Sequence, residues 1–125
     1  NRSKGFDGTA FLYKIPNAPG FHQAVLMGKF NTCDNYNHCA ITAATMSPDE
    51  TKIAILTHDK IILLENFKGD HFLEGTQTVL QLNHFSQKEA VCFKDNDLLL
   101  IADEKTKKIG GKVYAASLAT LKSVP

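Results

Sequence analysis

Three acidic residues at the ends of two apolar runs are the strongest candidates for chemistry in this sequence. Glu89 precedes the apolar run 90–93, and Asp103 and Glu104 follow the apolar run 98–102. Carboxylates that converge could hold Ca²⁺, or serve as acid and base on a phosphate ester. The alternative is structural: Glu89 would bind backbone amides of a neighbouring sheet, and the other two would begin an exposed, lysine-rich turn. A phosphate site would also need grouped basic residues, and the sequence has no visible group of that kind.

The three cysteines are Cys33, Cys39 and Cys92. Cys33 and Cys39 flank a polar loop and would form a disulfide in an oxidising compartment, or stay free thiols in a reducing one. Together with His38 they offer only three zinc ligands, in a spacing that matches no common zinc finger. Cys92 lies inside an apolar run, so we expect it to be a small buried residue.

Other motifs that suggest chemistry have simpler interpretations. His58 beside Asp59 has the composition of a catalytic dyad, but adjacent residues of a strand point to opposite faces, so we predict a turn. His84 and Phe85 follow a strand end and are expected to anchor their loop in the core. Asn1-Arg2-Ser3 is a formal glycosylation sequon at the chain end. The sequence has no P-loop, dinucleotide-binding fingerprint, nucleophile elbow or paired-histidine metal motif, which lowers the expectation of an enzyme.

Length and charge narrow the class of protein. The chain has 125 residues, the size of one domain with a real core. Its 14 Lys and Arg residues are dispersed and the formal net charge is +1, which argues against a nucleic-acid partner. No apolar run approaches the roughly 20 residues of a membrane span. The chain begins at Asn1 without a leader-like segment, which indicates either processing or excision from a longer protein.

Short apolar runs, separated by Gly, Pro, Asn or Asp, predict β-strands along the whole chain. Two segments have the character of helix starts, Ser47-Pro48-Asp49-Glu50 and Ser86 to Glu89. We predict both as turns, because the run after the first is rich in isoleucine and too short for a helix. The expected strands are 10–15, 24–27, 40–46, 52–57, 60–64, 78–82, 89–93, 98–102 and 112–116.

Three of these strands are apolar at nearly every position: 53–56, 61–64 and 98–102. A sheet with one wet face would alternate, so these strands are expected to be buried on both faces. The connections are mostly too short for the crossovers that parallel pairing needs, which predicts antiparallel strands. Antiparallel sheets buried on both faces arise when sheets stack face to face, as the blades of a β-propeller do.

An internal repeat supports this architecture. Segment 44–49 with 53–56 resembles segment 90–95 with 99–102, at an offset of about 46 residues that is typical of propeller blades. The sequence therefore predicts an all-β fold, a partial β-propeller made of four-stranded antiparallel blades, in a single segment. The expected parts are a partial blade at 1–40, a full blade at 41–84 and a partial blade at 85–125.

Two segments resemble the blade signatures of known propellers. Residues 41–57, with Ser47-Pro48-Asp49 at their centre, resemble the blade signature of TolB-like propellers, in which Gly often stands at the position of Glu50. Residues 87–93 with 98–104 resemble a pattern of secreted bacterial propellers of the SdiA-regulated and esterase-like phytase type. The resemblance covers about half of the chain. It implies a secreted or periplasmic protein, and it implies that Glu89 lies at the central channel.

From this resemblance we expect a non-catalytic binding module that holds a protein or a glycan on a propeller face. The alternative is a metal-dependent hydrolase of the phytase or lactonase type, with Glu89, Asp103 and Glu104 as metal or acid–base groups at the channel. A third possibility is a purely structural segment. Ca²⁺ is the one cofactor that these hypotheses invoke. Two to three blades are fewer than the four that a ring needs, so we expect self-association or further blades from a longer chain.

Overall fold

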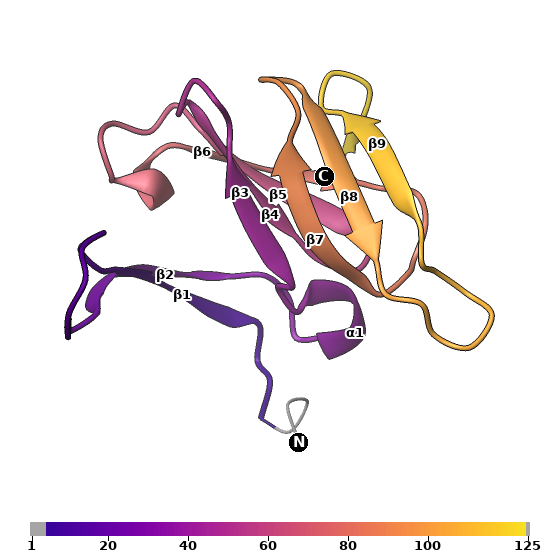
Figure 1. Cartoon of the computed structure of the whole chain (residues 1–125), viewed down its shortest axis with the longest axis horizontal. Coiled ribbons are helices and arrows are strands. Elements are labelled where there is room, and N and C mark those ends of the chain that lie inside the picture. Colours follow the sequence, from indigo (N-terminus) through magenta and orange to yellow (C-terminus); the bar gives the residue numbers. More distant parts are fainter. Residues whose placement is uncertain (1–4, 125) are drawn as a thin grey trace.

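The computed structural model describes residues 5–124 and is all-β with antiparallel pairing, as the sequence predicts (Figure 1). A two-stranded sheet joins β1 (Thr9–Lys14) and β2 (Val25–Asn31). A five-stranded sheet has the order β10-β6-β5-β4-β3, from β3 (Ala43–Met46), β4 (Lys52–Leu56), β5 (Lys60–Glu65), β6 (Thr76–Gln81) and β10 (Lys122–Ser123). A three-stranded sheet has the order β7-β8-β9, from β7 (Lys88–Phe93), β8 (Leu98–Asp103) and β9 (Val113–Ser117).

The sheets hold two, five and three strands, and thus differ from the four-stranded blades that we predicted. Strands β3 to β6 do follow one another in both sequence and space. However, Lys122 and Ser123 pair with Gln81 and Leu80, so β10 becomes a fifth strand at the β6 edge. The three-stranded sheet therefore gains no fourth strand from the end of the described chain.

Two short helical segments interrupt the strands, and the sequence analysis predicted neither. These are the α-helix α1 (Tyr36–Cys39) and the 3₁₀ segment η1 (Phe72–Glu74). Within residues 5–124, no helix has the length and apolar character that crossing a bilayer requires. The segment after Ser47 is a turn, as predicted, whereas Ser86 leads directly into β7, which begins at Lys88. Neither segment is helical.

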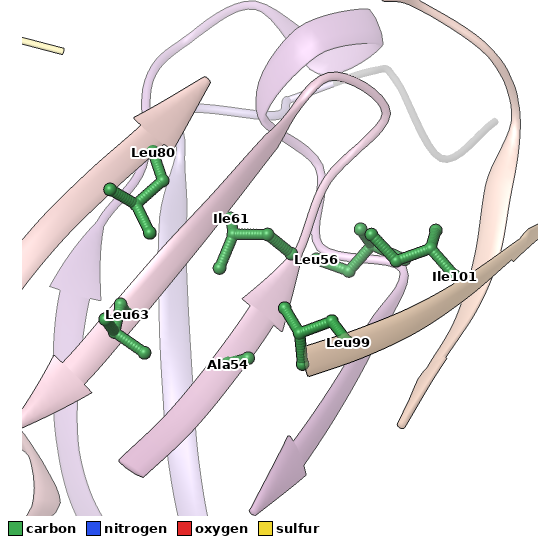
Figure 2. Packing of buried hydrophobic residues seen from close by; sticks show 7 residues of the cluster. All are labelled: Ala54, Leu56, Ile61, Leu63, Leu80, Leu99 and Ile101. Atoms are coloured by element: carbon green, nitrogen blue, oxygen red, sulfur yellow. The ribbon is translucent and has the colours of Figure 1, made fainter. Parts of the chain in front are cut away.

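The main core lies between the five-stranded and the three-stranded sheets (Figure 2). Leu56 of β4 and Ile61 of β5 are fully buried against Leu99 and Ile101 of β8. The remaining buried members of this cluster are Ala54, Leu63 and Leu80. Burial of this apolar surface is the main force that holds the two sheets together.

A second, smaller cluster lies on the opposite face of the five-stranded sheet. Ile55, Ile62 and Leu64 pack there against Phe30 of β2 and Leu73 of η1. Strands β4 and β5 are therefore buried on both faces, as their apolar sequences predict. The five-stranded sheet is the middle layer, with β1–β2 and β7–β9 on its two sides (Figure 1).

Strand β8 departs from the prediction of two-sided burial. Leu99 and Ile101 face the core, whereas Leu98, Leu100 and Ala102 alternate with them and are only half-buried. The neighbouring Cys92 of β7 is exposed, so the prediction of a buried thiol is wrong. Cys92 and the half-buried residues of β8 lie on the outward face of this sheet, which no described layer covers.

The two hairpins that carry the internal repeat, β3–β4 and β7–β8, end in related turns. The carboxylates of Asp49 and Asp95 each accept hydrogen bonds from backbone N–H groups two or three residues later in the sequence. The backbone N–H of Asp49 also donates to Asn96 Oδ1 at 3.0 Å, so the turns lie side by side. Glu50 has φ 60°, in the left-handed region where glycine is favoured.

Candidate functional site

One end of the sheets gathers polar groups from three separate connections: the segment around α1, the β4–β5 turn and the β6–β7 loop. His58 Nδ1 in the β4–β5 turn lies 2.9 Å from the Asn37 carbonyl oxygen in α1. Lys88 Nζ donates to the carbonyl oxygens of His58 at 2.6 Å and of His84 at 3.1 Å. These bonds join the three connections into one unit.

The helix α1 has four residues, too few to be stable alone, and local constraints hold it in place. Cys33 and Cys39 form a disulfide in the structure, with their Cα atoms 5.4 Å apart. The Asn35 side chain caps the helix by accepting a bond from a backbone N–H of the first turn. The ring of Tyr36 packs edge-on against Phe6, with ring centroids 5.4 Å apart. The disulfide, the cap and the ring contact together fix the position of α1.

Asp59 is the buried carboxylate at this end and is 8% exposed. Its Oδ2 lies 2.7 Å from His38 Nδ1, and its Oδ1 lies 2.6 Å from Lys60 Nζ. Burial alone raises the pKa of Asp59, but the hydrogen bonds and charges of Lys60 and His38 outweigh it, so the pKa lies below its usual value. Asp59 is therefore an ionised group that ties the β4–β5 turn to α1.

Lys88 is fully buried at the start of β7. Besides the two carbonyl oxygens, its Nζ donates to Ser86 Oγ at 3.0 Å. Burial lowers the pKa of Lys88, while the carboxylates of Asp103 and Asp59 oppose that shift. All three N–H donors of an ammonium have acceptors, so this group has no lone pair with which to activate Ser86 as a nucleophile. Lys88 acts as a clamp between the β4–β5 turn and the β6–β7 loop.

A β-bulge follows Lys88. Lys88 pairs with Asp103 and Ala90 pairs with Ala102, so Glu89 is an extra residue on the β7 side. Lys88 is buried, whereas Glu89 is exposed. Bulges commonly redirect side chains next to functional sites. Here the bulge makes Glu89 part of the wall of a pocket.

This pocket has a volume of about 310 Å³ and is mainly polar. Its walls are Tyr36, Asn37, Ala40, Ile41, Thr42, His58, Gln87 and Glu89. His58 Nδ1 must donate to the Asn37 carbonyl oxygen, which only accepts, so Nε2 of the neutral imidazole is an acceptor. With the Glu89 carboxylate, the pocket is rich in hydrogen-bond acceptors. No lysine or arginine is among its described lining residues.

The structure does not bring the three candidate carboxylates together in this pocket. Glu89 lines it, whereas Asp103 accepts bonds from the Tyr114 hydroxyl and from the Lys112 backbone N–H at 2.8 Å. These two bonds lower the pKa of Asp103 to about 2. Glu104 is exposed at the end of β8. Among residues 5–124, no three His, Cys, Asp or Glu side chains are placed to hold a metal ion.

The other sequence candidates have separate roles. The zinc set of Cys33, His38 and Cys39 does not form in this structure, because both sulfur atoms are in the disulfide and His38 binds Asp59. His58 and Asp59 form no dyad, since each bonds to a different residue of α1. They lie in a turn, as predicted.

The expectation that His84 and Phe85 anchor their loop in the core is wrong. Phe85 is 51% exposed and lies against the rings of His38 and His58, with centroids 5.1 and 5.5 Å away. His84 is also exposed and stacks on Tyr114. Lys88 holds this loop instead, through its bond to the His84 carbonyl oxygen. The sequon Asn1-Arg2-Ser3 falls outside the described residues, because residues 1–4 are not described.

A second pocket, of about 270 Å³, adjoins the disulfide, and both Cys33 and Cys39 line it. Its walls are largely apolar, with Ile62 and Val79 among them. Its one lysine, Lys60, already donates to Asp59 and to the His38 carbonyl oxygen at 3.2 Å. The polar pocket beside Glu89 is therefore the stronger candidate for a functional site.

The sequence analysis found Glu89 but missed its partners in the pocket. Tyr36, Asn37 and Thr42 lie in a connection that carries no repeat signature, and Gln87 lies in the β6–β7 loop. The available signal was the polar, aromatic-containing loop between two cysteines. A ring closed by a disulfide holds its side chains in fixed positions, which suits a binding wall.

No family model, curated protein or solved structure matches this chain. The functional argument therefore depends on the geometry of the chain itself.

Proposed function

We propose that this chain is a binding module whose polar pocket holds a neutral, hydroxyl-rich ligand, a glycan. The observation that carries the proposal is the composition of the pocket, whose walls include a carboxylate, an imidazole acceptor, two amides, a threonine hydroxyl and one tyrosine. Sugar hydroxyls can donate hydrogen bonds to a carboxylate or to an imidazole nitrogen. With a side-chain amide, a hydroxyl can donate to the oxygen and accept from the NH₂ group. Tyr36 adds an aromatic ring to the same walls, and such rings bury apolar surface beside a polar hydroxyl.

The charge of the pocket supports a neutral ligand. Glu89 would repel an anion, and the described walls supply no lysine or arginine to compensate. A phosphate ester is therefore a poor fit, which disfavours a phytase-like hydrolase. Asp103 also has internal partners, so its use as a metal ligand or base would require breaking them. Binding without catalysis fits these groups better.

We further propose that the sheets are blades of a β-propeller in a secreted or periplasmic protein. Three features support the blade interpretation: the repeated hairpins, the consecutive strands β3 to β6 and the face-to-face packing of the sheets. The disulfide Cys33–Cys39 supports the compartment, because disulfides persist in oxidising environments. In this interpretation the pocket lies at the start of β7, the first strand of a blade, where Glu89 follows Lys88.

Isothermal titration calorimetry with a panel of neutral oligosaccharides of glucose, galactose, mannose, xylose and N-acetylglucosamine tests the proposal. We expect at least one to bind, and Glu89→Ala to weaken it about tenfold or more, because hydrogen bonds to charged groups contribute about 1.5–3 kcal/mol. Glu104→Ala is the matched control, since it removes an exposed carboxylate outside the pocket, and it should leave affinity unchanged. Equal loss in both variants, or no binding by any sugar, would contradict the proposal.

A further inference from the structure

The outward face of the three-stranded sheet is apolar, and no sheet formed by residues 5–124 covers it. Its side chains come from alternate positions of β7, β8 and β9. Six of them are Ala90, Cys92, Leu100, Ala102, Val113 and Ala115, and the pair Leu98 and Ser117 lies at the end of the same face. Val113 is 72% exposed, and none of the six carries a charge. In a sheet with one solvated face, the residues on that face are mainly polar, whereas these six are apolar.

The internal repeat indicates what belongs on this face. At the repeat offset of about 46 residues, Ala54 and Leu56 of β4 correspond to Leu100 and Ala102 of β8. Ala54 and Leu56 are completely buried, because the β7–β9 sheet packs on them (Figure 2). The open face is thus the equivalent of a face that, within this chain, is covered by the next sheet. Continuation of the same stacking would cover it.

The opposite end of the stack has an open face with larger side chains. Phe11 and Tyr13 of β1 lie on one side of the β1–β2 sheet, with ring centroids 6.4 Å apart. Leu26 of β2 pairs with Tyr13 and shares that side. All three are more than half exposed, at 55%, 56% and 53%. The two ends of the stack therefore differ: one face carries large rings together with the exposed Lys29, which pairs with Phe11, and the other carries mostly small, uncharged residues.

We propose that a second copy of this chain stacks head to tail, with the β1–β2 face of one copy on the β7–β9 face of the next. The large rings of Phe11 and Tyr13 fit the β7–β9 face, because the small side chains of the alanines at positions 90, 102 and 115 leave space above that sheet. The contact continues the sheet-on-sheet packing already present between the β3–β6 and β7–β9 layers. The two contacting faces are different surfaces, so the association is heterologous and extends until a ring closes.

The geometry also sets the expected strength. A face three strands wide spans about 14 Å, because neighbouring strands lie about 4.8 Å apart. Such a face is smaller than a standard protein interface, so assembly should depend on concentration. Cys92 lies within the face and is its natural reporter, because stacking would shield its thiol. This inference rests on the stacking of the sheets and not on what the polar pocket binds.

Two variants, both with Cys92→Ser to prevent crosslinks, test the proposal by sedimentation velocity. Ala102→Lys places a charge in the β7–β9 face, and Tyr13→Lys places one in the β1–β2 face. We expect each variant alone to remain a monomer of 13.8 kDa, and an equimolar mixture to form a complex of two chains. In the mixture, the Ala102→Lys variant keeps its β1–β2 face and the Tyr13→Lys variant keeps its β7–β9 face. These two intact faces can still bind each other. Circular dichroism confirms that both variants are folded.

A third measurement needs no substitution in either face. In the unmodified chain, the rate at which Cys92 reacts with a maleimide should fall at least fivefold as the protein concentration rises from micromolar to millimolar. A chain that stays monomeric with an unchanged Cys92 rate would assign the face to another partner and overturn the proposal. Self-association of the Tyr13→Lys variant alone would also overturn it, because that result means that like faces pair.

Discussion

Replacing the buried Lys88 by methionine tests whether this residue clamps the polar end of the sheets. Methionine keeps the volume of the stem, so a cavity contributes little to the effect. The substitution removes three hydrogen bonds, at 2.6, 3.1 and 3.0 Å. The His58 carbonyl oxygen keeps only its 3.3 Å bond from the Ser86 backbone N–H, and the His84 carbonyl oxygen loses its Lys88 donor. Each bond to an ammonium contributes about 1.5–3 kcal/mol, and release from the cost of burying the charge offsets part of the sum. We expect a net loss of about 3 kcal/mol in the free energy of unfolding.

Urea denaturation followed by far-ultraviolet circular dichroism measures this loss. With a slope of about 1.5–2 kcal/mol/M for a domain of this size, the midpoint should fall by about 1.5–2 M. Lys94→Met is the matched control, since Lys94 lies exposed in the β7–β8 turn. Its free energy of unfolding should stay within about 0.5 kcal/mol of that of the unmodified chain. If Lys88→Met unfolds at the same urea concentration as Lys94→Met, the assignment of Lys88 as a clamp is refuted.

Three further predictions concern other parts of the chain. Replacing both Cys33 and Cys39 by serine should lower stability by about 2 kcal/mol in urea denaturation, the entropy expected for so short a loop, and an unchanged midpoint would contradict it. The pKa of Asp103 is about 2, below its value in the unfolded chain. The contribution of Asp103 to the free energy of unfolding is therefore complete above about pH 4 and is lost as the pH falls through 2. Asp103→Asn should therefore flatten the fall in thermal midpoint between pH 4 and 2, and a parallel fall would argue against this role. Glu50→Gly should raise the thermal midpoint slightly, because glycine relieves a left-handed backbone that costs other residues about 1 kcal/mol, and a lower midpoint would contradict that.

The sequence predicted the strands and the antiparallel sheets, because apolar runs and turn residues are local signals. Every apolar run that we expected as a strand overlaps one in the structure. The sheet sizes were not predictable in the same way. Strand β10 has only two residues, and its pairing with Gln81 and Leu80 depends on where the chain returns in space. Two-sided burial of β8 was also predicted from its sequence, but the described chain supplies a covering layer on one side alone.

The candidate site was predicted only in part, for a related reason. Glu89 stood out because it begins an apolar strand, yet the bulge that directs it into the pocket comes from the register with β8. The other walls come from α1, the β4–β5 turn and the β6–β7 loop, which are distant in the sequence. Lys88 had no signal at all, because a lysine at a strand start is ordinarily exposed. Its burial follows from carbonyl oxygens in two connections that meet only in the folded chain.

The most direct test of the central claim is a ¹⁵N chemical-shift titration of the unmodified chain with the neutral oligosaccharide panel. The account predicts that at least one sugar shifts the backbone amides of Asn37, Gln87 and Glu89 in a saturable manner. The amides of the outward face, such as Ala102 and Ala115, should stay in place. Shifts confined to other surfaces, or no saturable shift with any member of the panel, would contradict the assignment of the polar pocket as a glycan site.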